Sequence, residues 1–136
     1  MKFLYLFFLF LVGCVNATNT RSESNQSFCS PNSTIDKLEK YDFEDADTIH
    51  QSDIIKLEGV VTFQFENVAI YPKATSEPKD AFWIHFSPHL VEYINEIEKM
   101  DGKKVLVAGK LDFNQKGHLG SYKGTLDSIF CITTIQ

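Results

Sequence analysis

The amino-acid sequence predicts a mainly β domain with one helix, folded as a small β-barrel in the order strands, helix, strands. Two segments, residues 54–66 and 105–113, alternate apolar and polar side chains with a period of two, which is typical of half-buried strands. A helix start lies between them at Ser87-Pro88. An α+β roll is the alternative that the same order of elements permits.

The first strand is expected at residues 54–66. One of its faces carries Leu57, Gly59, Val61, Phe63 and Phe65, and the other carries Glu58, Thr62, Gln64 and Glu66. A glycine at position 59 predicts a bend or a bulge, because it offers no side chain to pack. Asn67 is expected to end this strand. A short extended piece at 68–71 and a proline-containing surface loop follow.

An aromatic strand and a helix are expected in the middle of the chain. In the strand at 81–86, Trp83 and His85 share one face, opposite Phe82, Ile84 and Phe86. Ser87 is a predicted N-cap, and the proline after it suits the first helical position. Apolar residues at helical spacing predict one helix that ends near Gly102: Leu90, Val91, Ile94 and Ile97.

Two strands joined by a glycine-containing turn complete the predicted domain. The last strand, residues 124–133, has apolar residues in mixed phase, which indicates burial on both faces or a bulge. Three glycines fall within residues 117–124 and favour unusual backbone conformations. His118 and Tyr122 then project polar tips at the mouth of a barrel, or satisfy backbone groups within a hairpin loop.

This order of elements resembles the OB-fold, in which a helix connects the third and fourth strands of a small barrel. The segment at 101–111 is similar to the fourth strand of many OB-like domains. The resemblance covers about residues 50–135. It is architectural, so it implies a fold and leaves the function open.

The N-terminus carries the features of an export signal. Lys2 precedes an apolar run at residues 3–12, which is too short to span a bilayer, and Leu11-Val12-Gly13-Cys14 closes the run. This ending resembles the lipobox of small bacterial lipoproteins, which implies cleavage before Cys14 and acylation of its thiol, for example with palmitate. A conventional cut after Val15-Asn16-Ala17 is the alternative and would release a secreted protein.

The lipobox resemblance divides the chain into three parts. It implies that residues 1–13 are a signal peptide and that residues 14–34 are a lipid attachment site with a polar tether. Residues 35–136 are then expected to form a single OB-like domain. Twelve of the twenty residues from 15 to 34 are Ser, Thr or Asn, a composition that cannot bury a core. Val15 stands where many inner-membrane lipoproteins have aspartate, so the resemblance favours the outer membrane, facing the periplasm.

The two cysteines that follow the leader, Cys29 and Cys131, predict a disulfide bond. An even number of cysteines in an exported protein is typical of such pairing, and an unpaired thiol is a liability in an oxidising compartment. The bond would join the start of the domain to its last strand. The alternative is one buried and one exposed free thiol.

The charge of the chain excludes several classes of partner. The formal net charge is −5, and it becomes −6 once Lys2 is removed with the leader. Nucleic acid needs a basic surface, so it is not expected as a partner even though OB barrels commonly bind it. Anionic lipid is excluded on the same ground, and the expected membrane link is the lipid on Cys14.

No catalytic residue, metal ligand set or cofactor is expected. The sequence has no H-E-x-x-H, C-x-x-C, P-loop or G-x-G-x-x-G motif. His85, His89 and His118 are candidate metal ligands by type, but a strand-to-helix break separates the first two. They are therefore interpreted as unrelated histidines.

These observations predict an envelope lipoprotein that acts as a non-enzymatic protein-interaction, scaffolding or inhibitor module with a protein partner. The residues expected to bind are Trp83, His85, His118 and Tyr122. The alternative is a periplasmic domain that binds a small ligand or a metal through His85, His118 and Tyr122.

Replacing the lipobox cysteine tests the anchor directly. The Cys14→Ala variant is expected to lose all labelling by a radioactive or clickable fatty acid, because the acylated thiol is absent. Fatty-acid labelling in cells, with the wild-type chain as the reference, measures this. Labelling retained in the variant contradicts the lipoprotein prediction.

Overall fold

The computed structural model describes residues 25–44, 51 and 53–136. The predicted signal peptide at 1–13, Cys14 and residues 15–24 of the predicted tether therefore lie outside the described residues. Among the described residues, no helix is long and apolar enough to cross a membrane.

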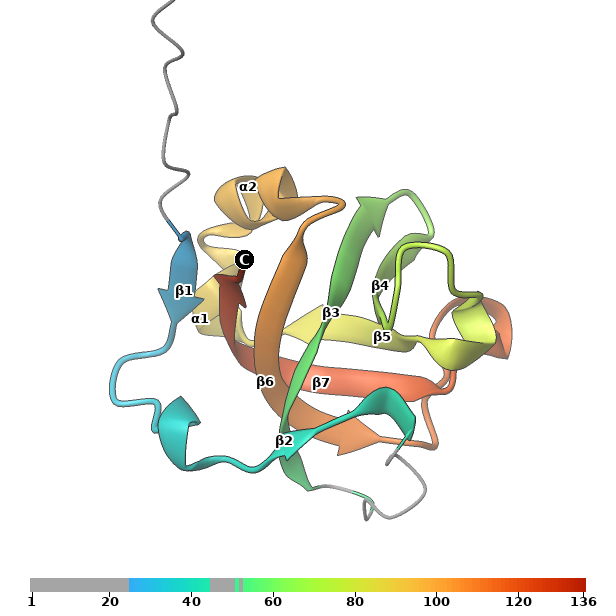
Figure 1. The fold of residues 1–136 in the computed structure, drawn as a ribbon, viewed down its shortest axis with the longest axis horizontal. Coiled ribbons are helices and arrows are strands. Elements are labelled where there is room, and N and C mark those ends of the chain that lie inside the picture. The colour runs from blue at the N-terminus through green and yellow to red at the C-terminus, as the bar shows by residue number, and fades with distance from the viewer. Residues whose placement is uncertain (1–24, 45–50, 52) are drawn as a thin grey trace, which may run out of the picture.

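Five strands form a closed barrel: β3 (Ile54–Gln64), β4 (Asn67–Tyr71), β5 (Phe82–Phe86), β6 (Lys104–Asp112) and β7 (Gly124–Thr134) (Figure 1). Around the barrel, β3 pairs with β4, β4 with β5, β5 with β7, β7 with β6, and β6 with β3. Of these five barrel pairs, only β5–β7 is parallel. The predicted OB-like barrel is confirmed, with the helical segment between β5 and β6.

The barrel interior is filled by the inward side chains of all five strands. Strand alternation places Phe82 and Ile84 inside and Trp83 and His85 outside. The two pairs lie on opposite faces, as predicted. The fully buried strand residues include Ile55, Leu57, Val61, Ile70, Phe82, Ile84, Val105, Val107, Leu111, Leu126, Ile129 and Ile132. A bulge in β7 explains the mixed phase of the last strand. The register of β7 against β6 shifts between Ala108 and Lys110, and Ser128, in the bulged part of β7, has φ +50°.

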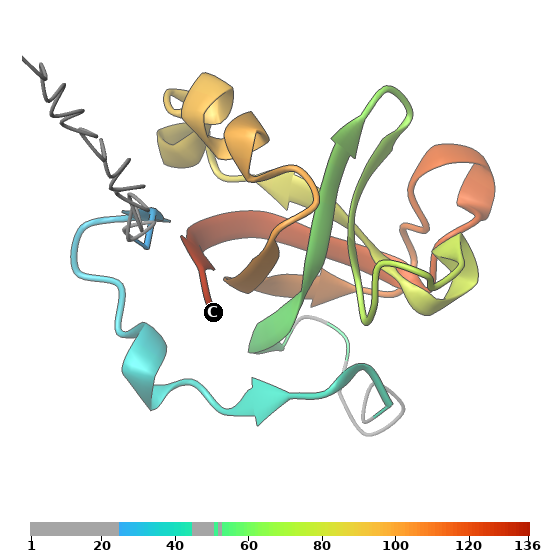
Figure 2. The ribbon, with the colours of Figure 1, turned by 45° about the horizontal axis from the view of Figure 1, so that its top comes forward.

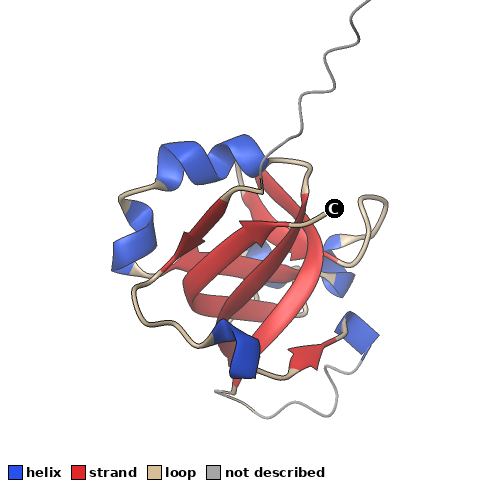
Figure 3. Ribbon diagram, turned by 60° about the vertical axis from the view of Figure 1, so that its left-hand side comes forward, coloured by secondary structure: helices blue, strands red, loops and turns tan. Residues whose placement is uncertain are grey.

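The predicted single helix is interrupted. It consists of α1 (Pro88–Val91), α2 (Ile94–Ile97) and a 3-10 turn (Glu98–Met100), which cross one end of the barrel (Figure 3). Leu90, Ile97 and Met100 seal that end, whereas Val91, expected on the apolar stripe, is 53 % exposed. The break places the Tyr93 ring 5.7 Å from that of Phe28, so a tertiary contact overrides helical continuity.

Serine at the helix start also departs from expectation. The Ser87 hydroxyl is buried and has no hydrogen-bond partner among the described residues, so it does not cap the helix. Its backbone carbonyl accepts from Leu90 and Val91 instead. The turn is therefore held by the backbone and by the proline that follows.

An N-terminal strap runs along the outside of the barrel (Figure 2). It contains β1 (Ser27–Cys29), a 3-10 turn (Ile35–Lys37) and β2 (Lys40–Tyr41). β1 pairs antiparallel with β7 and β2 pairs parallel with β3. β1 thus lies inside the segment that the sequence assigns to the polar tether, so the domain extends further toward the N-terminus than the predicted start at residue 35.

The strap is fixed at both of its ends. Cys29 and Cys131 lie opposite each other in β1 and β7 and form the predicted disulfide, across a separation of 102 residues. Closing a loop of this length stabilises a fold by about 5 kcal/mol in the chain-entropy model. At the other end, Phe43 packs 5.7 Å from Phe82, and Lys123 Nζ donates to the Phe43 carbonyl at 3.0 Å.

Two details of the first hairpin correct the sequence analysis. β3 ends at Gln64, and Asn67 begins β4 rather than ending β3. Phe65, expected on the inner face, is 92 % exposed because it lies in the two-residue hairpin turn with Glu66, whose φ is +58°. Outside a strand, the period of two no longer determines where a side chain points.

Glycine at position 59 is required by close packing. A Cβ there would overlap the Tyr71 carbonyl oxygen and lie 2.8 Å from Ile70 Cγ1. Gly59→Ala is expected to lower the free energy of unfolding by about 3 kcal/mol, because overpacking forces the barrel wall apart. Urea denaturation of the variant and the wild type measures the difference.

Gly102→Ala is the matched control. No atom lies within 4 Å of a Cβ at that position, so only its φ of +75° is unfavourable for alanine. We expect it to cost about 1 kcal/mol. Equal losses for the two variants contradict the packing explanation.

Candidate functional site

The outward side chains of β3, β4 and β5 form one continuous surface, which we call the outer face. Cross-strand pairing places Thr62 beside Ala69 and Ala69 beside Trp83, and it places Gln64 beside Asn67. The outer face consists of Thr62, Gln64, Asn67, Tyr71, Trp83 and His85. The β3–β4 turn and the loop between β6 and β7 border it.

At its centre, Asn67 holds two tyrosines. Its Oδ1 accepts hydrogen bonds from the Tyr71 hydroxyl at 2.8 Å and from the Tyr122 hydroxyl at 3.0 Å. Burial, together with the neighbouring Tyr71 hydroxyl, raises the pKa of Tyr122 to about 12. Because Oδ1 is engaged twice, Nδ2 is left as the donor that Asn67 offers to a ligand.

Trp83 occupies the side of the outer face toward β7. Its ring packs edge-on against Tyr122, with centroids 5.1 Å apart, and its Nε1 donates to His85 Nε2 at 2.9 Å. His85 Nδ1 lies 3.6 Å from Asp127 Oδ1. His85 therefore links Trp83 to Asp127 across the outer face.

The loop from Phe113 to Lys123 is fitted onto Trp83. Gly117, with φ +60°, lies so close that a Cβ would be 2.7 Å from Trp83 Cβ and Cγ. Thr125 Oγ1 donates to the Gln115 carbonyl at 2.8 Å, and the Tyr122 amide donates to Lys116. The predicted need for unusual glycine conformations is confirmed at this position.

The same loop meets the β3–β4 turn across the edge of the outer face. His118 Nε2 lies 3.5 Å from Glu66 Oε2. Beside each of these residues stands an exposed apolar side chain, Phe65 at 92 % and Leu119 at 87 % exposure. Leu119 also has φ +55°, a left-handed conformation that is unfavourable for leucine.

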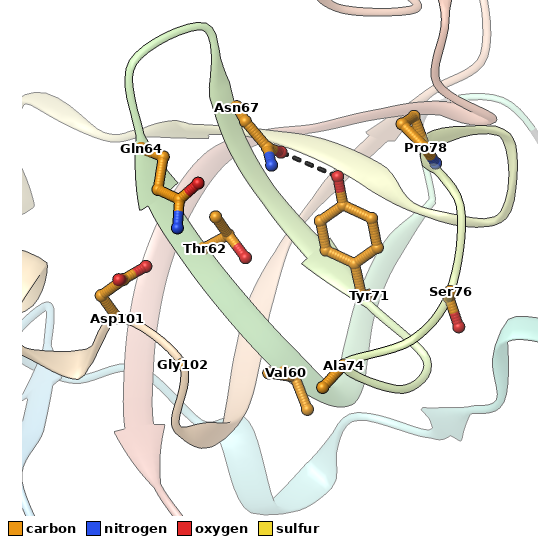
Figure 4. Close-up of a pocket in the computed structure, with 10 residues that line it drawn as sticks. All are labelled: Val60, Thr62, Gln64, Asn67, Tyr71, Ala74, Ser76, Pro78, Asp101 and Gly102. Carbon is orange, nitrogen blue, oxygen red and sulfur yellow. Dashed lines mark hydrogen bonds between the residues drawn. The ribbon is translucent and has the colours of Figure 1, made fainter.

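Two hollows open on the outer face. The first, of about 480 Å³, lies over β3 and β4, and the 72–80 loop and Asp101-Gly102 wall it (Figure 4). The second, of about 390 Å³, lies over β5 and residues 115–118. Tyr122 connects them, since it bonds Asn67 of the first and packs against Trp83 of the second.

The structure brings the four predicted binding residues to one region. Trp83, His85 and His118 line the second hollow, and Tyr122 lies buried against Trp83. Tyr122 and His118 bond side chains, Asn67 and Glu66, rather than the backbone. Asn67 and Tyr71 were not among the residues predicted to bind, and Phe65 was expected on the inner face of its strand. A polar residue at a hairpin start was the available signal for Asn67.

Near His85, Ser128 Oγ donates to Asp127 Oδ2 at 3.1 Å. Within residues 25–44, 51 and 53–136, no three His, Cys, Asp or Glu side chains gather as metal ligands. The candidate ligands have separate partners: His85 contacts Asp127, His89 packs against Tyr93, and His118 contacts Glu66.

No protein-family model matches this chain, and searches of curated proteins and of solved structures also give no match.

Titration of Tyr122 tests the buried hydroxyl cluster. Its pKa is raised above the ordinary value of 10.0 to about 12, so the folded state holds the phenol proton more tightly than the unfolded state. The resulting stability is fully present below pH 10 and is lost as the pH rises through about 12. Urea midpoints measured across this pH range are expected to fall. In Tyr122→Phe this part of the pH dependence disappears, and an unchanged profile contradicts the assignment.

Proposed function

We propose that this protein is a membrane-anchored envelope lipoprotein whose OB-like domain is a non-enzymatic interaction module for another protein. In this proposal the lipid on Cys14 holds it in the outer membrane, and the domain faces the periplasm. The net charge of −6 that remains once Lys2 is removed with the leader suits a partner whose contact surface is bordered by basic residues.

The observation that carries the proposal is the exposure of Phe65 and Leu119. They are the two most exposed large apolar side chains among the described residues. Leu119 combines this exposure with a φ of +55°, a backbone conformation that costs leucine more free energy than it costs glycine or asparagine. The free domain gains nothing from this arrangement, whereas burial of both side chains against a partner would be favourable.

The loops that carry these side chains are already ordered by contacts. Glu66 and His118 approach within 3.5 Å, and Gly117 packs directly on Trp83. A preformed surface loses little conformational freedom when it binds, which favours affinity.

The surroundings have the composition of a protein interface. Half-buried Trp83 lies next to the loop, and tryptophan is enriched among residues that dominate binding energy. Polar and charged groups border it: His85, Asp127, Lys116, His118 and Glu66. An apolar centre with a polar rim is the usual anatomy of such contacts.

Site-specific photocrosslinking in intact cells tests this proposal. A photoreactive phenylalanine analogue is placed at Phe65 or Leu119 of the full chain, and at Ile54 or Val91 as controls. The controls are apolar and exposed by 56 % and 53 %, but they lie outside the outer face. We expect one protein adduct, identified by mass spectrometry, from both loop positions and from neither control.

A double substitution provides the quantitative check. Phe65→Ser with Leu119→Ser is expected to lower recovery of that partner about tenfold or more, because both apolar anchors are lost. Ile54→Ser with Val91→Ser should leave recovery unchanged. Equal adducts at all four positions, or none at the two loops, contradict the proposal.

A further inference from the structure

The first hollow, over β3 and β4, has a chemistry of its own. Neither Phe65 nor Leu119 lines it, and its walls come from the 72–80 loop and from Asp101-Gly102 (Figure 4). Its volume of about 480 Å³ lies within the range of small-molecule sites. It therefore shares the outer face with the surface proposed to contact a protein but is lined by other residues.

Several polar groups in this hollow have hydrogen-bonding capacity left over. The side chains of Thr62 and Gln64 make no hydrogen bond to any other described residue, and Asn67 Nδ2 remains a donor. Asp101 accepts the Phe63 amide with Oδ1 only, at 2.8 Å. The hollow thus offers both donors and acceptors to a ligand.

Apolar surface lies at the other end. In Figure 4, Val60 and Ala74 stand below the polar group, and the Tyr71 ring rises between them and Asn67. The ring is held there by its bond to Asn67. Tyr71 is only 7 % exposed, so a ligand in this hollow meets hydrogen-bonding groups on one side and, on the other, the Val60 and Ala74 side chains with the open edge of the Tyr71 ring.

The charges of the lining select the class of ligand. Among its ten lining residues there is no Lys, Arg or His, so nothing compensates a phosphate or a carboxylate. The single carboxylate, Asp101, falls short of the ligand set that a divalent cation requires. A neutral ligand with many hydroxyl groups fits, because each hydroxyl both donates and accepts and its C–H face packs on a ring.

We propose that this hollow binds a neutral saccharide. Thr62, Gln64, Asn67 and Asp101 bond its hydroxyl groups, and Tyr71 with Val60 packs against the ring carbons. The aligned Asn67 Nδ2 fixes the orientation of the sugar, since its Oδ1 is committed to two tyrosines.

Glycan binding by the full chain tests this inference. The protein is held in a zwitterionic detergent without a sugar headgroup and applied to an array of neutral, sialylated and sulfated oligosaccharides. We expect retention on neutral glycans. The dissociation constant of the best one, measured in solution, is expected to rise about tenfold in Thr62→Val with Gln64→Ala, which removes two hydrogen-bonding groups.

Gln115→Ala is the matched control, because this exposed glutamine lines the second hollow instead. It should bind the glycan like the wild type. Absence of any retained neutral glycan, preference for acidic ones, or equal binding by the double variant overturns the inference. Crosslinking from Leu119 should persist in the Thr62→Val, Gln64→Ala variant. The saccharide proposal and the protein-contact proposal can therefore fail independently.

Discussion

Parallel hydrogen bonding between β5 and β7 closes the barrel, with Trp83 opposite Thr125 and Ile84 opposite Leu126. Parallel neighbours cannot be joined by a tight turn, so the chain must pass through the helical segment and β6 before β7 arrives. That detour buries Leu90, Ile97 and Met100 over one end. It also sets the 113–123 loop beside β5, where the second hollow forms.

The outer face follows from the same closure, because every strand presents alternate residues to the outside. Its two halves differ in how their polar groups are used. Toward β7, Trp83, His85 and Asp127 already satisfy one another. Toward β3, Thr62 and Gln64 have no partner among the described side chains. The polar side chains of the first half are already hydrogen-bonded to one another, which is the basis for proposing a protein contact there. Those of the second half have hydrogen-bonding capacity left over, which is the basis for proposing a small polar ligand.

Local periodicity was sufficient to predict the barrel strands and to place Trp83 and His85 together on one strand face; that this face points outward was not predicted. The features that it missed depend on contacts between distant segments. The helix breaks where Tyr93 meets Phe28, and Phe65 leaves the core because the hairpin turns one residue before it. Asn67 gains its role only when β4 brings it toward Tyr122, 55 residues away. Nothing in the neighbourhood of Asn67 in the sequence encodes that distance.

The disulfide between Cys29 and Cys131 also determines how the molecule carries mechanical tension. A pull between the N-terminal segment and the C-terminus passes from Cys29 through the covalent bond into the last residues of β7. Residues 30–130, which contain both hollows together with Phe65 and Leu119, are then outside the path of the force. Tension on the ends of the chain would therefore bypass the two surfaces that are proposed to bind.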